Sequence, residues 1–112
     1  MIENYTFGSF MIDGSEYRYD IKIKGEEIIP WRYIKHHTVL ADDIRELVKA
    51  KPELLVIGTG ASGLVRVEDE AISFAESKGI KCIIKLTGEA CEDYNNALKE
   101  NKKVCAILHS TC

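Results

Sequence analysis

The sequence predicts one α/β domain over residues 1–112, in which an N-terminal antiparallel β-meander is followed by a βαβαβ unit. Apolar residues alternate with polar ones in the first third of the chain and recur at helical spacing from Leu40 onward. In the second half, short apolar runs alternate with helical segments, which is typical of parallel strands joined by helices. The length of 112 residues suits one ordinary domain, and no linker or repeat divides it.

The meander is predicted from residues 16–24, where apolar and polar side chains alternate strictly. This period of two indicates a half-buried strand. An Asp-Gly pair at 13–14 is a hairpin-turn signal, because such a pair tolerates positive φ angles, and it predicts a partner strand around Thr6–Ile12. A Lys-Gly turn after the strand leads into a third strand over Glu26–Trp31. We therefore expect three antiparallel strands that follow one another in a single sheet.

The first helix and the first strand of the βαβαβ unit follow the meander. Apolar residues recur at helical spacing from Leu40 to Val48, and Pro52 ends the predicted helix after Ala50. The run Leu54–Ile57 is apolar throughout, which is typical of a strand covered on both faces. A helix thus leads directly into a central strand.

The remaining elements repeat this alternation. A helix is predicted over residues 68–78 with Gly79 in its C-terminal cap, and it is followed by a second buried strand over Ile80–Leu86. Thr87 is expected to cap the N-terminus of a third helix, and Val104–Leu108 is a third apolar strand. Right-handed crossovers should place the helices over the sheet.

Composition and charge exclude several classes of protein. With 46% hydrophobic and 29% charged residues, the chain is globular rather than disordered or collagen-like. A formal net charge of −3 gives no positive excess for nonspecific binding to nucleic acid or anionic lipid. The longest apolar runs are far shorter than the roughly twenty residues that span a bilayer, and no signal peptide is evident. We therefore expect a cytoplasmic protein with no nucleic-acid or membrane partner.

The cysteines are expected to be reduced thiols, since an intracellular chain with a sufficient core does not need disulfides. The spacing Cys105-x3-His109-x2-Cys112 comes closest to a metal-ligand cluster. Structural zinc needs four convergent ligands, however, and Cys105 lies inside an apolar run. We expect no metal site and no cofactor. The four cysteines are Cys82, Cys91, Cys105 and Cys112.

A glycine-rich loop at residues 58–63 (Gly-Thr-Gly-Ala-Ser-Gly) follows the strand Leu54–Ile57 with the pattern G-x-G-x-x-G. In dinucleotide-binding folds such glycines let the backbone approach a pyrophosphate at a helix N-terminus. Here the next helix is expected to begin several residues later, near Glu68. The acidic residue expected at the end of the next strand is also missing, because Lys85 and Leu86 occupy that region. These two departures count against dinucleotide binding.

A looser interpretation of the loop is a site for a small anion or a carboxylate. Hydroxyls and exposed amides of a glycine-rich loop can hold such a ligand at the carboxyl end of a strand. The last strand ends at the same side of the sheet, which makes His109 a candidate for the same edge, but the sequence does not place it relative to Gly58 and Gly60. The alternative is a tight turn that needs glycine for its backbone geometry alone. The candidate ligand-binding residues are Gly58, Thr59, Gly60, Ser62, Gly63, Arg66 and His109.

Several segments together resemble one known family, and the match spans nearly the whole chain. They are Phe7-Gly8-Ser9 before a hairpin, Tyr17 and Asp20, the strand and loop Leu55–Gly60, Thr87-x-x-Ala90 with Tyr94-Asn95, and the ending His109–Cys112. The sequence is similar to the adipogenesis-associated single-domain proteins, to their uncharacterised archaeal and bacterial relatives and, more distantly, to a mitochondrial complex I assembly factor. Within the loop, Gly58 and Gly60 alone match the family. The resemblance implies a compact three-layer α/β fold around a mixed sheet.

The leading hypothesis for function is a non-catalytic domain that acts through protein contacts as an assembly or accessory factor. The animal and mitochondrial members of the family suggest such roles, and no constellation of acid, base and nucleophile is evident, so no catalytic residue is predicted. The alternative is a protein that binds a small molecule or anion, or an enzyme, using the loop after residues 54–57. Either hypothesis is compatible with a monomer, or with a homodimer formed through an edge strand of the meander.

Overall fold

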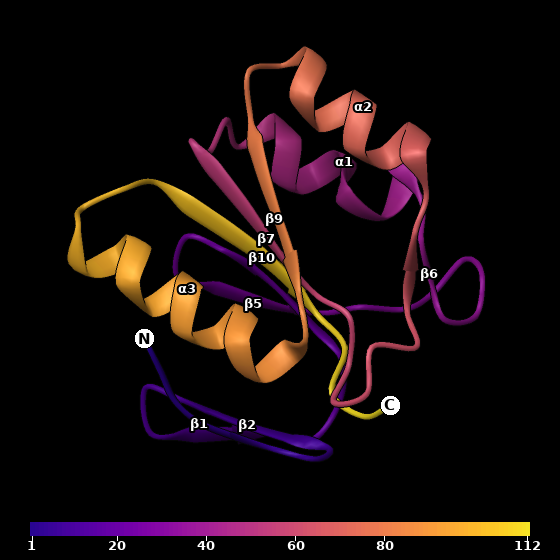
Figure 1. Cartoon of the computed structure of the whole chain (residues 1–112). Coiled ribbons are helices and arrows are strands. Elements are labelled where there is room, and N and C mark those ends of the chain that lie inside the picture. The colour runs from indigo at the N-terminus through magenta and orange to yellow at the C-terminus, as the bar shows by residue number, and fades with distance from the viewer.

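The computed structural model describes residues 1–112 and confirms the α/β fold around a mixed central sheet. The sheet consists of β4 (Ile21–Lys24), β5 (Glu27–Pro30), β7 (Leu54–Gly58), β9 (Lys81–Lys85) and β10 (Val104–Leu108). Its strand order is β5-β4-β10-β7-β9 (Figure 1). Strand β10 pairs in parallel with β7 and antiparallel with β4, while β9 runs parallel to β7. The βαβαβ unit therefore supplies the three parallel strands.

Helices cover both faces of this sheet and complete the three layers. Helices α1 (Ala41–Lys49) and α2 (Asp69–Ser77) lie on one face, and α3 (Thr87–Lys99) lies on the other (Figure 1). Each helix agrees with its predicted position to within a few residues. None of the three helices has the length and the hydropathy that crossing a bilayer requires.

Two smaller sheets flank the central one. The strands β1 (Ile2–Thr6), β2 (Ser9–Ile12) and β3 (Ser15–Tyr17) form an antiparallel sheet in chain order, which packs in the same layer as α3. The strands β6 (Thr38–Val39) and β8 (Arg66–Val67) form a short parallel pair. Because α1 follows β6 and α2 follows β8, this pair sets the two helices side by side in the same direction.

The core is split in two by the central sheet. Leu54 and Val56 of β7 face α3 and the small antiparallel sheet, whereas Leu55 and Ile57 face α1 and α2. All four side chains are buried. This arrangement confirms that the uninterrupted apolar run is a strand covered on both faces.

The predicted N-terminal antiparallel β-meander is confirmed, but it consists of β1, β2 and β3, and the three strands predicted for it are divided between two sheets. The alternating segment 16–24 is broken between β3 and β4, so that β3 pairs with β2 while β4 and β5 form the antiparallel edge of the central sheet. The strand β1 was not predicted. The break occurs at Asp20, whose carboxylate accepts hydrogen bonds from the end of the chain and whose carbonyl oxygen accepts one from Trp31 N, at 2.8 Å. These hydrogen bonds hold the chain at the point where it passes from the small sheet to the central sheet.

Two further local predictions need correction. The strand β9 is an edge strand rather than a buried one, and Ile84 on it is 40% exposed. Thr87 does not cap α3, since Leu86 occupies the N-cap position and Thr87 is the first helical residue. Its buried hydroxyl instead donates to the carbonyl oxygen of His109, at 2.7 Å.

Candidate functional site

The parallel strands β7 and β10 bring the candidate residues of the sequence together at one edge of the sheet. Leu108 pairs with Gly58 at the ends of the two strands. The next residue, His109, donates its backbone N–H to the carbonyl oxygen of Gly58, at 3.0 Å. The glycine loop and His109 are therefore neighbours, a placement that the sequence alone left open.

The loop holds the C-terminal tail, residues 109–112, through its backbone amides. Ala61 N donates to the carbonyl oxygen of Thr111 at 2.6 Å, and Leu64 N donates to that of Cys112 at 3.1 Å. Gly60 N donates to the hydroxyl of Thr87, at 2.8 Å. The donors that an anion would use are thus engaged by the chain itself. Figure 1 shows the C-terminal tail beside the turn that follows β7.

Glycine is required in this loop by close approach of the backbone. A Cβ atom at Gly60, where φ is +106°, would lie 2.2 Å from the carbonyl carbon of Cys112. A Cβ atom at Gly58 would lie 2.9 Å from the Thr87 hydroxyl oxygen and 3.1 Å from Thr87 Cα. The two glycines that match the family are therefore the two that pack directly against the tail and α3.

A buried polar network centred on Asp20 lies next to the loop. One carboxylate oxygen of Asp20 accepts from the backbone N–H and the hydroxyl of Ser110, at 2.6 and 2.7 Å. The other oxygen lies 2.8 Å from Nδ1 of His109 and also accepts the hydroxyl of Tyr33. The network ties β4, the segment after β5 and the C-terminal tail into one unit.

The hydrogen bonds of this network control the ionisation of its members. Burial raises the pKa of Asp20, but hydrogen bonds from His109, Tyr33 and Ser110 outweigh burial and hold that pKa at about 2. Burial and the adjacent carboxylate raise the pKa of Tyr33. Asp20 is therefore a buried carboxylate that stays ionised over most of the pH range.

The same network contains a line of acid, imidazole and hydroxyl groups. Nδ1 of His109 faces Asp20, and its Nε2 lies 3.3 Å from Oγ1 of Thr111. This order of groups activates hydroxyl nucleophiles in hydrolases. Here His109 is 1% exposed, and none of the five surface cavities is lined by His109 or Thr111. The contacts from Asp20 through His109 to Thr111 hold the C-terminal tail in place.

The other candidate residues lie outside this buried group. Arg66 is exposed in β8, where its backbone N–H donates to the carbonyl oxygen of His37 at 2.9 Å. Ser62 and Gly63 are exposed at the tip of the loop, whereas the hydroxyl of Thr59 donates to the carbonyl oxygen of Lys85. Binding of an anion by this loop stays a prediction.

The cysteines are unpaired thiols in the structure. Burial, reinforced by Glu92, raises the pKa of Cys91 to about 12. Burial also raises the pKa of Cys82 and of Cys105. These three side chains are protonated at neutral pH, as small hydrophobic residues of the interior are.

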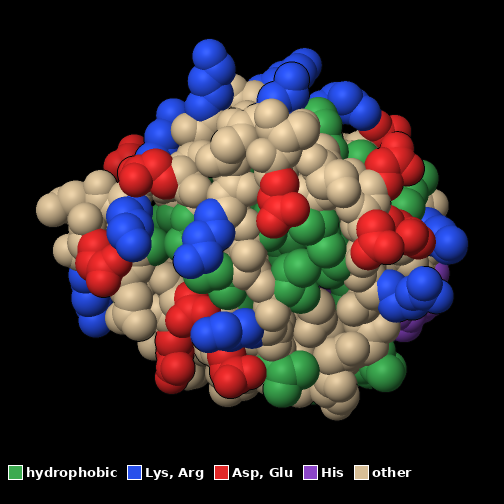
Figure 2. All heavy atoms as spheres, turned by 45° about the horizontal axis from the view of Figure 1, so that its top comes forward, with side chains coloured by type: hydrophobic (Ala, Val, Ile, Leu, Met, Phe, Trp, Pro, Cys, Tyr) green, Lys and Arg blue, Asp and Glu red, His purple; other side chains and the backbone are tan.

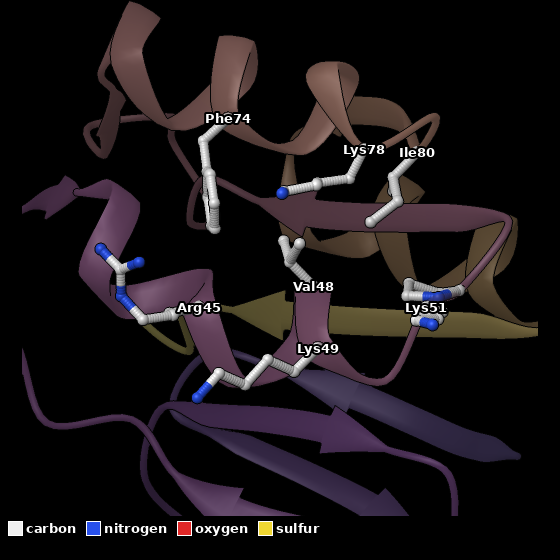
Figure 3. Close-up of a pocket in the computed structure, with 8 residues that line it drawn as sticks. Arg45, Val48, Lys49, Lys51, Phe74, Lys78 and Ile80 are labelled. Atoms are coloured by element: carbon white, nitrogen blue, oxygen red, sulfur yellow. The ribbon is translucent and has the colours of Figure 1, made fainter.

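Sequence reasoning missed a cleft between α1 and α2, with a volume of about 500 Å³. Its floor is apolar, and Figure 3 shows Phe74 pointing from α2 toward Val48 of α1. Four cationic side chains and no acidic ones line it, namely Arg45, Lys49, Lys51 and Lys78. Helical spacing could have found part of it, because Arg45 and Lys49 are four residues apart on α1, as Phe74 and Lys78 are on α2.

Comparison with known families identifies the relatives of the chain. The model of a family described as proteins of unknown function, DUF498/DUF598, matches residues 2–109. The chain belongs to this family. The chain is also similar to a curated protein, NADH dehydrogenase [ubiquinone] 1 alpha subcomplex assembly factor 3 of Xenopus tropicalis, with 23% identity over 109 residues. The match covers 96% of this chain and 59% of that protein, so the chain spans less than two thirds of its length.

Solved structures of similar proteins share the fold over nearly the whole chain. A conserved hypothetical protein, PH1505 from Pyrococcus horikoshii OT3, is 27% identical with a TM-score of 0.88, and the match covers 100% of this chain and 99% of that one. The protein MT938 is 28% identical with a TM-score of 0.84, covering 100% and 98%. These findings confirm the resemblance to archaeal and bacterial proteins and, more distantly, to a complex I assembly factor.

Proposed function

We propose that this chain is a non-catalytic protein-binding domain that serves as an assembly or accessory factor. The observation that carries the proposal is a set of exposed apolar side chains on segments that border the C-terminal tail and the glycine loop, which we call the apolar rim. It consists of Phe7, Leu64 and Leu86, which are 65%, 57% and 43% exposed. The distant relationship to a complex I assembly factor supports a role of the same kind for this domain.

The three side chains of the apolar rim project from segments that are fastened to one another. Gly8, next to Phe7, donates its N–H to the carbonyl oxygen of Ser110 at 2.7 Å, and Leu64 N donates to the C-terminal tail. A Cβ atom at Gly63 would lie 2.9 Å from Leu86 Cδ2, so Leu86 packs against the loop. Each anchor is therefore held by fixed backbone before any partner arrives.

Such an arrangement suits a protein interface better than a solvated surface. Large apolar side chains on rigid backbone lose little conformational entropy on binding, so most of the free energy of their burial contributes to affinity. Figure 2 turns the top of Figure 1, with α1 and α2, toward the viewer and shows hydrophobic side chains interspersed with acidic and basic ones on that face. Exposed apolar patches rimmed by polar residues mark interaction sites.

The proposal is tested by capture of partners from an extract of the cells that produce the protein. The tagged chain and a Phe7→Ser/Leu64→Ser variant are immobilised in parallel, and bound proteins are quantified by mass spectrometry at low and at high salt. We expect a defined partner that the wild-type chain retains at high salt and the variant loses by about tenfold or more. Lys99→Ser, on the exposed end of α3, is the control and should retain that partner.

Either of two results would contradict the proposal. The wild-type chain and the rim variant capture the same proteins, or binding to both is lost at high salt. In that case the apolar rim contributes nothing to partner choice.

A further inference from the structure

We propose that the cleft between α1 and α2 binds a small organic anion, in which a phosphate or carboxylate is joined to an aromatic or branched aliphatic group. This site is separate from the apolar rim and does not depend on the proposed function. Pro52 and Ile80 line the cleft and stand just before β7 and β9, so the cleft lies at the amino ends of the parallel strands. The apolar rim lies at their carboxyl ends.

The fold explains why a ligand site would be found at this end. In open α/β sheets, ligands usually bind beyond the carboxyl ends of the strands. Here the C-terminal tail occupies that position and takes up the amides of Ala61, Ser62 and Leu64. The cleft between the helices is the largest concave site that remains, and its volume of about 500 Å³ falls within the range of small-molecule sites, roughly 300–1,000 Å³.

The walls of the cleft are two helices that run side by side in the same direction, as set by β6 and β8. Val48 from α1, Phe74 from α2 and Ile80 after α2 form an apolar floor. The guanidinium carbon of Arg45 lies 5.2 Å from the centre of the Phe74 ring, which fixes a cation at the edge of that floor (Figure 3). An apolar group on the floor would thus lie within reach of positive charge.

The charges around the cleft are unbalanced. Lys49, Lys51 and Lys78 make no ion pair, and Arg45 pairs only with Asp42, one turn away on its own helix. The C-terminal ends of α1 and α2 each offset roughly half a unit of this positive charge. The cleft therefore stays cationic in a chain whose formal net charge is −3. A lysine near the C-terminus of each helix is favourable for the helix itself, because it offsets the partial negative charge there. That effect does not account for the apolar side chains that line the cleft between the lysines.

The apolar floor and the positive charge of the cleft together favour a ligand that has both an apolar part and an anionic part. An inorganic ion alone would leave the exposed part of the floor, chiefly the Phe74 ring, in contact with water, because Val48 and Ile80 are already buried. A neutral aromatic compound would leave the cations without a partner. A molecule with both parts covers the floor and neutralises the cations, so its two interactions reinforce each other.

The test is a titration of the isotopically labelled full chain, followed through its amide resonances, with 1-naphthyl phosphate. Inorganic phosphate and 1-naphthol serve as probes that carry only the charge or only the ring. We expect saturable shifts confined to the C-terminal ends of α1 and α2 and to Ile80, with an affinity about tenfold or more above that for either single probe. Increasing salt should weaken the binding.

Matched variants locate the site. Lys49→Gln/Lys78→Gln removes two exposed cations from the cleft and should weaken binding of 1-naphthyl phosphate by about tenfold or more. Lys35→Gln/Lys99→Gln removes the same charge from exposed positions elsewhere and should change the affinity by less than about twofold. The amide spectrum of each variant shows that the fold is retained.

Three results would each overturn the proposal. The first is an affinity for 1-naphthyl phosphate no greater than that for inorganic phosphate. The second is a loss of binding in the control pair as large as that in the cleft pair. The third is a set of shifted amides that lies outside the cleft.

Discussion

Asp20 is the residue on which the strand-end network depends. It is 9% exposed, and its two oxygens meet the side chains of Tyr33, His109 and Ser110 together with a backbone N–H. A buried carboxylate is stable only when its partners are in place, and those partners are equally dependent on it. One side chain thus links residues that lie about ninety positions apart in the chain.

Removing the charge of Asp20 should destabilise the whole domain. In Asp20→Asn, an amide group faces His109 and Tyr33 where a carboxylate accepted both, so we expect the free energy of unfolding to fall by about 2–4 kcal/mol. Urea unfolding measures this change. Asp42→Asn breaks an exposed ion pair with Arg45 and should cost less than about 1 kcal/mol. Equal losses in the two variants would show that the buried network contributes no more to stability than the exposed ion pair does.

The same carboxylate predicts how stability depends on pH. The pKa of Asp20 is about 2 in the folded chain against an ordinary value of 3.8, so the folded state binds this proton more weakly than the unfolded state does. Its contribution, of order 2 kcal/mol, is present in full above about pH 4 and is lost as the pH falls through 4 toward 2.

Urea unfolding at a series of pH values checks this dependence. The wild-type chain should lose stability more steeply than Asp20→Asn between about pH 4.5 and 2.5, because the variant has no proton to bind at this position. Parallel curves for the two proteins would assign the acid sensitivity to other carboxylates.

At the scale of elements, the glycine loop acts as a clamp on the C-terminal tail. Gly60→Ala would place a Cβ atom 2.2 Å from the carbonyl carbon of Cys112, at a φ of +106°. We expect a loss of about 2–4 kcal/mol, since the tail must move and its hydrogen bonds with it. Gly14→Ala is the matched control, because its φ is +84° but nothing lies within 4 Å. It should cost only about 1 kcal/mol of backbone strain.

Both glycine variants are compared by urea unfolding and by hydrogen exchange of the amides of Ala61 and Leu64, which bind the tail. Faster exchange of these amides in Gly60→Ala alone supports the clamp. If the two variants lose the same stability and exchange alike, glycine is needed at position 60 for its backbone angle only.

Elements with a strong local pattern could be predicted from the sequence. Leu54–Ile57 and Val104–Leu108 were found because both faces of these strands are covered, which leaves an uninterrupted apolar run. The helix ending at Lys49 was found because its apolar side chains recur at helical spacing and Pro52 follows. The placement of His109 beside Gly58 was not predicted, because it depends on the register of the parallel pairing of β7 and β10.

Features that depend on distant partners could not be predicted. At the break between β3 and β4, Ser110 donates two hydrogen bonds to Asp20, and the local alternation of residues 16–24 gives no sign of them. A threonine at position 87 also suits a helix N-cap, but the hydroxyl of Thr87 donates its hydrogen bond to the carbonyl oxygen of His109 instead. The α1–α2 cleft requires the relative placement of two helices, which the short pair of β6 and β8 determines.

At the scale of the whole molecule, the two ends of the sheet differ. At the carboxyl ends of the parallel strands, the chain fills the usual ligand position with its own tail and presents the apolar rim around it. At the amino ends, a cationic cleft with an apolar floor is open. A partner protein at the rim and a small anion in the cleft would therefore contact different surfaces.

Protein binding through the apolar rim is tested most directly by a hydrogen-exchange footprint of the chain alone and in complex with a captured partner. We expect slower exchange around Phe7, Leu64 and Leu86 in the complex, with little change at the cleft between α1 and α2. Protection confined to β5 or to the cleft, or failure to isolate any complex that the rim variant weakens, would contradict it.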